Sequence, residues 1–325
     1  MAGPSAPRAP SGSSLAAGKP PIADHTFRWL SLVCGLVVLA VLALIAVSTT
    51  GKALPAFRHQ GISFVTSKNW DPSNGHFGAL AYIYGTLVTS VIALVVAVPV
   101  SVGIALVLTE VAPVRARMPI VYAVDLLAAV PSVVYGLWGV LFLAPKLGQL
   151  YGHIGSATHG IPIVGTLFSG GTSGRSLFTA GLIVALMVTP IVTSLTREVF
   201  ETVPRAQKEA ALALGATRWE MIRGAVFPYG RSGVVGAVML GLGRAMGETI
   251  AVTLLIGSSA QITAHLFGSG DSMAAVIANQ FGEATGLARS AFLGLGVALF
   301  IITVIVNASA RTVLVRAERR LGTAL

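Results

Sequence analysis

Two residues of opposite charge, Arg244 and Glu248, lie in the apolar stretch VVGAVMLGLGRAMGETIAVTLLIG (234–257), which is long enough to cross a bilayer. A charged side chain at membrane depth is costly, about 2.5 to 3.5 kcal/mol for Arg, so a functional role is the default interpretation. The guanidinium presents planar, paired N–H donors that fit the oxygens of an oxyanion. We therefore predict that Arg244 binds an anion on its way across the membrane.

Glu248 has a less obvious role, because a carboxylate repels an anion. Residues four apart on one helix share a face, so Glu248 is expected to lie where it can neutralise Arg244. It could hold the arginine until substrate arrives, or be protonated and donate a hydrogen bond. The structural alternative is an ion pair that locks this helix to its neighbours. Since the pair sums to zero charge, we expect a second subunit to supply another arginine.

The elements that must position these residues are membrane-spanning helices. Hydrophobic residues make up 54% of the 325 residues and charged residues only 10%, which excludes an ordinary soluble domain. The predicted fold is therefore all-α, with six transmembrane helices. Their predicted bounds are about 29–50, 80–108, 120–144, 176–196, 232–257 and 290–310, within a membrane domain of residues 29–315.

The distribution of basic residues predicts the orientation. If both termini are cytoplasmic, the inner segments carry 15 of the 22 Lys and Arg residues and the outer segments six. Basic residues concentrate on the cytoplasmic side of membrane proteins, so the N and C termini are predicted to lie inside. Topology thus explains the net charge of +10, and nucleic-acid binding is disfavoured. Residues 1–28 are predicted to be a disordered tail and residues 316–325 a second cytoplasmic tail.

The longest predicted cytoplasmic connection, residues 197–231, is here called the elbow. The run AQKEAALAL predicts one short helix that Gly215 ends with a left-handed cap. Thr217 and Glu220 form a capping-box pattern that begins a second short helix, which Pro228 is expected to terminate. Such an elbow could be a topological anchor, a nucleic-acid helix-turn-helix or a docking element for a cytoplasmic motor.

A motif within the elbow resembles a known family. EAALALG (Glu209–Gly215), followed after nine residues by AVFP (Ala225–Pro228), is similar to the EAA loop of permease subunits of bacterial ABC importers. The resemblance implies the type I importer permease fold and an elbow that inserts into a groove of an ATPase subunit. Glu209 would cap or form an ion pair within the elbow, and Gly215 would supply its turn. The residues assigned to this coupling loop are Glu209, Ala210, Ala211, Gly215 and Pro228.

Three further segments narrow the resemblance to the phosphate-importing members of that family. They are FGALAYIYGTLVTS (77–90), LAAVPSVVYGLWGV (127–140) and GLGRAMGETIAVT (241–253). The resemblance implies that Arg244 and Glu248 serve phosphate translocation in a bacterial plasma membrane. It also implies the partners: a homologous permease subunit, two ATPase subunits that bind ATP and Mg²⁺, and an extracytoplasmic phosphate-binding protein.

No catalytic machinery is visible in this chain. The near-miss GSSLAAGKP (12–20) lacks the spacing and the Ser or Thr of a P-loop, so no ATPase and no cofactor site are expected. Two rival functions remain open: a secondary anion transporter or channel, which leaves the elbow unexplained, and an importer of another oxyanion, such as sulfate or molybdate.

Five other charged or metal-ligating positions receive simpler interpretations. Asp125 could face the bundle interior or pair with Arg115 or Arg117 near the cytoplasmic surface, and the pairing is the favoured interpretation. His153, with His159, lies in a predicted outer loop without acidic or Cys companions, so a metal site is disfavoured. Asp271 and Glu283 are interpreted as surface charges of the last outer loop.

Overall fold

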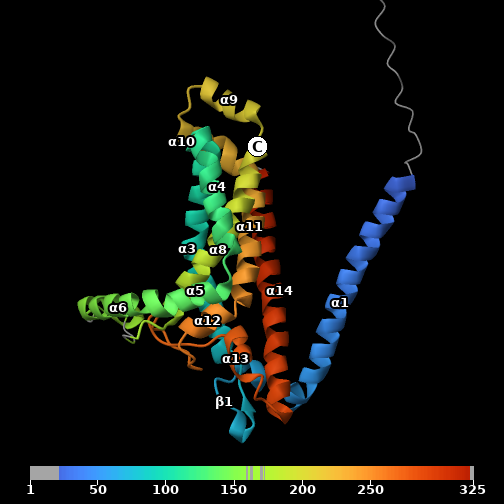
Figure 1. The fold of residues 1–325 in the computed structure, drawn as a ribbon, viewed down its shortest axis with the longest axis vertical. Helices are drawn as coiled ribbons and strands as arrows, with labels where there is room; N and C mark the ends of the chain where they lie inside the picture. Colours follow the sequence, from blue (N-terminus) through green and yellow to red (C-terminus); the bar gives the residue numbers. More distant parts are fainter. Residues whose placement is uncertain (1–21, 159, 162–163, 169–170, 172, 323–325) are drawn as a thin grey trace, which may run out of the picture. The chain divides into compact units, whose positions relative to one another are not determined.

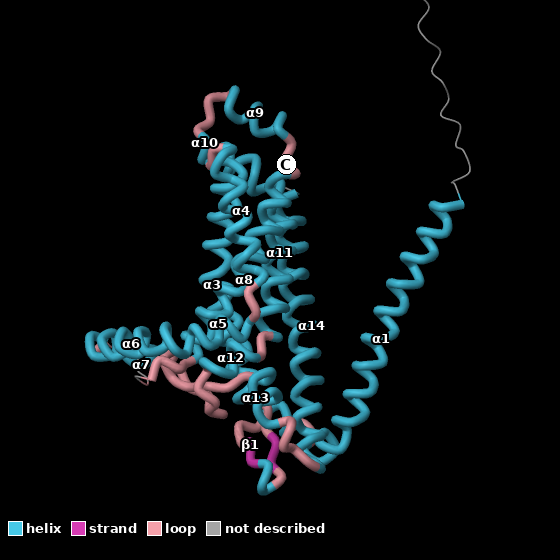
Figure 2. The backbone as a smooth tube through the Cα atoms, in the orientation of Figure 1, coloured by secondary structure: helices cyan, strands magenta, loops and turns pink. Residues whose placement is uncertain are grey.

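The computed structural model describes residues 22–322 except 159, 162–163, 169–170 and 172. Helices dominate these residues, and the strands described are confined to one small hairpin (Figure 2). Six of the described helices are long and apolar enough to span a membrane. These candidate spans are Thr26–Gln60, Leu80–Val111, Ser132–Thr158, Leu177–Glu201, Arg218–Gly247 and Gly286–Thr312.

The first helix, α1 (Ile22–Gln60), begins inside the segment predicted to be a disordered tail. Residues 22–28 are helical, so the predicted tail is too long at its inner end; residues 1–21 lie outside the described part. The part of α1 up to Ser48 forms a unit of its own, and its large apolar side chains are exposed throughout. A helix that is apolar on all sides is suited to face lipid.

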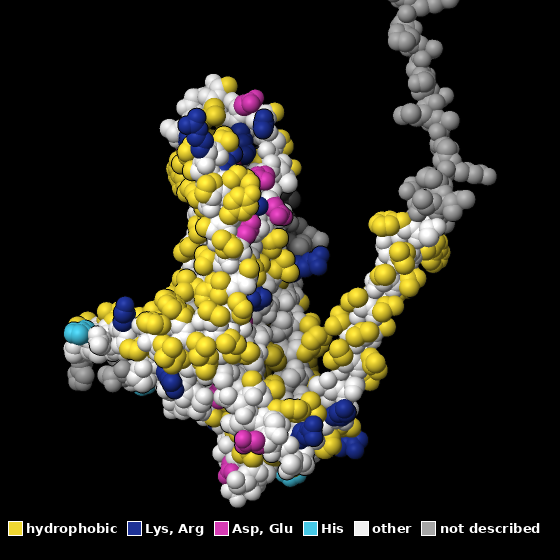
Figure 3. Space-filling view, in the orientation of Figure 1, with side chains coloured by type: hydrophobic (Ala, Val, Ile, Leu, Met, Phe, Trp, Pro, Cys, Tyr) yellow, Lys and Arg dark blue, Asp and Glu magenta, His cyan; other side chains and the backbone are white. Residues whose placement is uncertain are grey.

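A bundle of helices forms the second unit, Thr49–Leu325 (Figure 1). Its central helix, α8 (Leu177–Glu201), packs against α3 (Leu80–Leu106) and α11 (Phe227–Gly247), and α14 (Gly286–Gly322) also contacts α11. Ile183, Val184, Val188 and Val192 of α8 are almost completely buried. The middle of the bundle is therefore organised around α8, while its outer surface is largely apolar (Figure 3).

The third predicted span, 120–144, is not one helix. The structure breaks at Val130 and Pro131, because the proline fixes its own φ and keeps the preceding residue extended. α4 (Val114–Ala129) runs along the bundle, α5 (Ser132–Trp138) packs against α12 (Ile250–Leu255) and α8, and α6 (Ala144–Thr158) extends away from the bundle (Figure 1). Half of the predicted outer loop 145–175 is thus helical, and His153 lies on α6.

The fifth span differs from its prediction at both ends. The short helix α10 (Arg218–Met221) continues through a π-helical turn, η4 (Ile222–Val226), into α11, so Pro228 does not terminate it. Pro228 occupies the first turn of α11, where a missing N–H is tolerated. At the other end α11 stops at Gly247, and α12 (Ile250–Leu255) begins after a break at Glu248 and Thr249.

The end of the bundle opposite the elbow contains the small elements. Strands β1 (Trp70–Asp71) and β2 (His76–Phe77) pair in antiparallel register, with Trp70 opposite Phe77. The Asp71 carboxylate caps the turn between them, and its hydrogen bond from the Asn74 side chain lowers the pKa of Asp71.

The remaining elements are α2 (Ser63–Thr66), η1 (Pro72–Asn74), η2 (Val107–Val111), η3 (Gly139–Leu143), α7 (Val164–Phe168), α9 (Arg205–Ala213) and α13 (Met273–Gln280).

Candidate functional site

Arg244 lies in the last turn of α11, and its side chain is exposed. It forms no ion pair and no hydrogen bond within the described residues, 22–322 with their few gaps. The neighbours Ala245 and Met246 are buried, so this turn is held by packing while the guanidinium points out of the chain. A cation in a membrane-spanning helix that has no partner among the described residues is available for a ligand or another subunit.

Glu248 does not continue the helix that carries Arg244. Its backbone is extended, with ψ 128°, and Thr249, the N-cap of α12, belongs to neither helix. The two charged residues are therefore not one turn apart on a common helix face, and they form no ion pair in the part of the chain described. The prediction of a shared face is wrong because α11 ends at Gly247, before the helix reaches Glu248.

The glycines around Arg244 divide into two sets. A Cβ at Gly241 would lie 2.7 Å from Val192 and 2.8 Å from Val188, so this glycine lets α11 pack closely on α8. A Cβ at Gly236, Gly243 or Gly247 would meet nothing within 4 Å. The small residues next to Arg244 thus leave open space on the chain's surface, where the backbone of a second helix can approach closely.

The first arm of the elbow has the predicted form. α9 ends in a left-handed residue, Gly215, with φ 87°. The amide of Gly215 donates to Leu212 and that of Ala216 to Ala211, which together form a Schellman motif. The capping box of the second arm is also confirmed: Glu220 N–H donates to Thr217 Oγ1 (3.3 Å) and Thr217 N–H to Glu220 Oε2 (2.7 Å).

The elbow brings three of its five predicted residues to one open groove. Ala210 and Ala211 of α9 and Pro228 of α11 line it, together with the largely exposed Leu214. Trp219 is exposed as well, at 62%. Apolar side chains displayed on a tightly capped elbow are typical of a docking surface.

Glu209 does not cap or form an ion pair within the elbow, as was expected of it. It is exposed and has no hydrogen-bond or ion-pair partner among residues 22–322 as described. The neighbouring Lys208 instead forms an ion pair of 2.5 Å with Glu110, 98 residues earlier in the chain. The sequence offered a weak signal, since Glu110 is an acidic residue at the end of a long apolar run.

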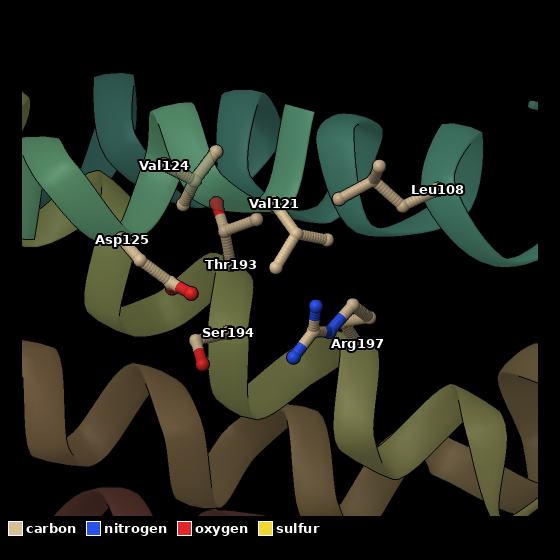
Figure 4. Close-up of a pocket in the computed structure, with 7 residues that line it drawn as sticks. All are labelled: Leu108, Val121, Val124, Asp125, Thr193, Ser194 and Arg197. Carbon is tan, nitrogen blue, oxygen red and sulfur yellow. The ribbon is translucent and has the colours of Figure 1, made fainter. Parts of the chain in front are cut away.

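Asp125 does not pair with Arg115 or Arg117 in the described structure. Arg117 donates instead to the carbonyls of Thr109 (3.0 Å) and Ala112 (3.1 Å). Asp125 lines a narrow pocket between α4 and α8, which it shares with Arg197 (Figure 4). Thr193 and Ser194 of α8 line the same pocket, and the Thr193 hydroxyl has no hydrogen-bond partner among the described residues.

Asp271 is not a surface charge. Its side chain is 4% exposed, and burial raises the pKa of this carboxyl to about 6, although the Ser272 amide donates to it. A Cβ added to Gly85 would lie only 1.9 Å from the carbonyl oxygen of Asp271, so the last outer loop packs tightly on α3. Glu283 is exposed, in agreement with its prediction.

Comparison with known proteins identifies the family to which this chain belongs. Residues 83–322 match the family described as the inner membrane component of binding-protein-dependent transport systems. The chain belongs to this family. It is a transmembrane permease of the kind found in ABC importers, and its matched region includes both the elbow and Arg244.

Relatives in the family are similar along most of their length. A protein of Xylella fastidiosa named phosphate transport system permease protein PstC is 46% identical, covering 92% of this chain and 93% of its own. The protein named PstC 2 of Mycobacterium tuberculosis is 43% identical, covering 89% of this chain and 91% of its own. A bacterial ABC transporter that imports the polysaccharide alginate shares the fold, with a TM-score of 0.58 over 90% of this chain and 99% of its own at 19% identity.

Proposed function

We propose that this chain is one of two permease subunits of an ATP-driven phosphate importer in a bacterial plasma membrane. The observation that carries the proposal is the 46% identity to a PstC protein over 92% of the chain. The exposed cation of Arg244, at the break of the fifth span, is the chemical feature that fits this substrate.

Arg244 is proposed to bind phosphate during translocation. Phosphate near neutral pH carries one to two negative charges, and a guanidinium donates two parallel hydrogen bonds to such an ion. The residue is presented to the outside of its own chain, next to the open glycines Gly243 and Gly247. A homologous permease subunit packed on this face would enclose the site and add a second arginine.

Glu248 is proposed to serve the same path from the other side of the break. It is not bound to Arg244 in this structure, so the role of a resting counter-ion loses its geometric basis here. Of the two roles considered for Glu248, a hydrogen bond to phosphate is the one that needs no contact with Arg244.

The elbow is proposed to dock on an ATPase subunit that binds ATP and Mg²⁺, so that this chain needs no cofactor of its own. Its exposed apolar residues, including Leu214 and Trp219, would fill a groove of that partner. Deletion of the elbow should uncouple ATP hydrolysis from transport.

We further propose that both termini are cytoplasmic and that a phosphate-binding protein docks at the outer end. The C-terminal end of α14 lies at the same end of the bundle as the elbow, where Lys and Arg side chains gather (Figures 1 and 3). The hairpin and α13 lie at the opposite end, which would face the binding protein.

The test is to purify the chain with its partner subunits, reconstitute them in lipid vesicles, and measure phosphate uptake and ATP hydrolysis. We expect ATP-dependent uptake that phosphate stimulates and sulfate does not. Sulfate or molybdate uptake in place of phosphate would reassign the substrate. Uptake by this chain alone, without ATP, would identify a secondary transporter and contradict the proposal.

A further inference from the structure

A buried ion pair ties the elbow to a helix that is distant in sequence. Lys208 Nζ on α9 lies 2.5 Å from Glu110 Oε1, at the end of the second span. The Glu110 side chain is 7% exposed and that of Lys208 19%, so little water screens the pair. Lys208 points to the same side of α9 as Ala211, which packs with the apolar cluster below the elbow.

Stability alone is a poor explanation of this pair. Removing two opposite charges from water costs about as much as their attraction returns, and apolar replacements of buried pairs are often as stable. What such a pair provides is a defined geometry, because each charge tolerates few other positions. The pair therefore fixes α9 relative to the turn that contains Glu110.

The turn around Glu110 is itself held on its far side. Glu110 lies in η2, the π-helical extension of α3, and this turn ends at Ala112. Arg117 of α4 donates to the carbonyls of Thr109 and Ala112, which bracket Glu110. A displacement of α9 is thus communicated to the junction between α3 and α4.

Contacts within the bundle extend this connection to Arg244. The Ser101 hydroxyl of α3 donates to the Thr189 carbonyl of α8 (3.0 Å). Gly241 of α11 packs against α8 without room for a Cβ. Chain connectivity joins the elbow to α8 and α11, and both of these helices pack on α3. The ion pair adds a direct link from α9 to the end of α3, next to its junction with α4.

We propose that the Lys208–Glu110 pair is the positioning link that makes α3 and α4 follow the elbow, so that ATP-driven movement reaches the translocation path as one body. This inference rests on the proposed function, in which the elbow docks on an ATPase. Neither residue touches the substrate. Both act by fixing the position of helices.

The experiment uses the complete reconstituted transporter and measures phosphate imported per ATP hydrolysed. The double variant Glu110→Gln/Lys208→Met removes both charges, so no unpaired charge remains buried. We expect normal assembly and a fall of at least fivefold in phosphate imported per ATP. The swapped variant Glu110→Lys/Lys208→Glu should return this ratio to within twofold of wild type. Lys146→Met, an exposed lysine of α6, is the matched control and should leave the ratio unchanged.

Three results would overturn the proposal. The first is an unchanged ratio in the neutral double variant. The second is failure of that variant to co-purify with the ATPase subunits, which would make the pair a docking or folding element. The third is a swapped variant that assembles yet stays as uncoupled as the neutral one. If wild type imports no phosphate on ATP, the proposed function fails instead, which distinguishes the two failures.

Discussion

Two pairs of opposite charges behave in opposite ways in this molecule. Arg244 and Glu248 are four residues apart in the sequence, yet the helix ends between them and they form no ion pair in the described structure. Lys208 and Glu110 are 98 residues apart, and they form a buried ion pair of 2.5 Å. Short spacing along a helix creates a pair only if the helix continues through both residues.

The difference also separates two uses of charge in a membrane protein. A charge such as that of Arg244, which has no partner among the residues described, is suited to a mobile ligand or another subunit. A charge that is paired and buried, such as Glu110, defines the position of the elements that carry it. The following experiments test whether the two pairs differ in this way.

The largest effect is expected at Arg244. Arg244→Ala should lower phosphate uptake by about 100-fold, because loss of a charge-assisted hydrogen-bonding group costs about 3 kcal/mol. Arg244→Lys should also lose uptake, since an ammonium lacks the paired planar donors. Uptake into vesicles is the measurement, with co-purification of the partner subunits as evidence of assembly.

The exchange Arg244→Glu/Glu248→Arg is the matched control for the contrast between the pairs. Uptake should not recover, in contrast to the exchange of Glu110 and Lys208. Recovery would mean that Arg244 and Glu248 act as a pair, and normal uptake by the single Arg244 variants would remove Arg244 from the path.

A smaller effect is expected at the turn of the elbow. Gly215 has φ 87° and open space around its Cβ position, so Gly215→Val strains the backbone without a steric clash. The left-handed conformation costs a non-glycine residue about 1 to 2 kcal/mol, and uptake should fall by roughly tenfold. Gly296→Val on α14 is the control, because that glycine also has open space but no positive φ. Equal losses in both variants would show that bulk, and not the turn, is responsible.

Asp271 allows a related test, because it is a buried acid that has no ion-pair partner among the described residues. The pKa of Asp271 is raised to about 6, so the folded protein favours the protonated carboxyl and stability falls as pH rises from about 4 through 6. Asp271→Asn should abolish this dependence and be more stable near pH 8, by at most about 3 kcal/mol. Thermal unfolding in detergent between pH 4 and pH 8 measures it.

Asp71→Asn provides a control of opposite sign for that measurement. The pKa of the exposed Asp71 is lowered, so its contribution to stability is present above its usual pKa and disappears as pH falls. A wild-type protein whose stability rises between pH 4 and pH 6 would contradict the assignment at Asp271.

The smallest effect is expected from Glu248→Gln on stability. Glu248 has no ion-pair partner among the described residues, so its neutralisation should change the melting temperature by only about 1 to 2 °C. A Glu110→Gln variant, which leaves Lys208 buried and unpaired, should be destabilised considerably more. Similar melting temperatures for both variants would remove the distinction between the two pairs.

Features that depend on local geometry were predictable from the sequence. The left-handed turn at Gly215 and the capping box of Thr217 and Glu220 are set by residues within four positions of one another. The helical membrane fold follows from long apolar runs. In each case the energetic cause lies inside one short segment.

Features that depend on where helices stop were predicted less well. Pro228 was expected to end a helix, but a π-helical turn before it lets the chain continue. No proline marks the end of α11 at Gly247. The third span divides at Pro131, and α6 then extends away from the bundle. Such ends are decided by packing against neighbouring helices as much as by local propensity.

The sequence by itself determined that this chain is a helical membrane protein with a capped elbow and a rare charge at membrane depth, because hydropathy and capping act over short distances. Only the tertiary structure decided which charges meet. The pairing of Lys208 with Glu110, the burial of Asp271 and the separation of Arg244 from Glu248 each depend on how distant helices pack, and electrostatic energy depends on distance and burial in three dimensions.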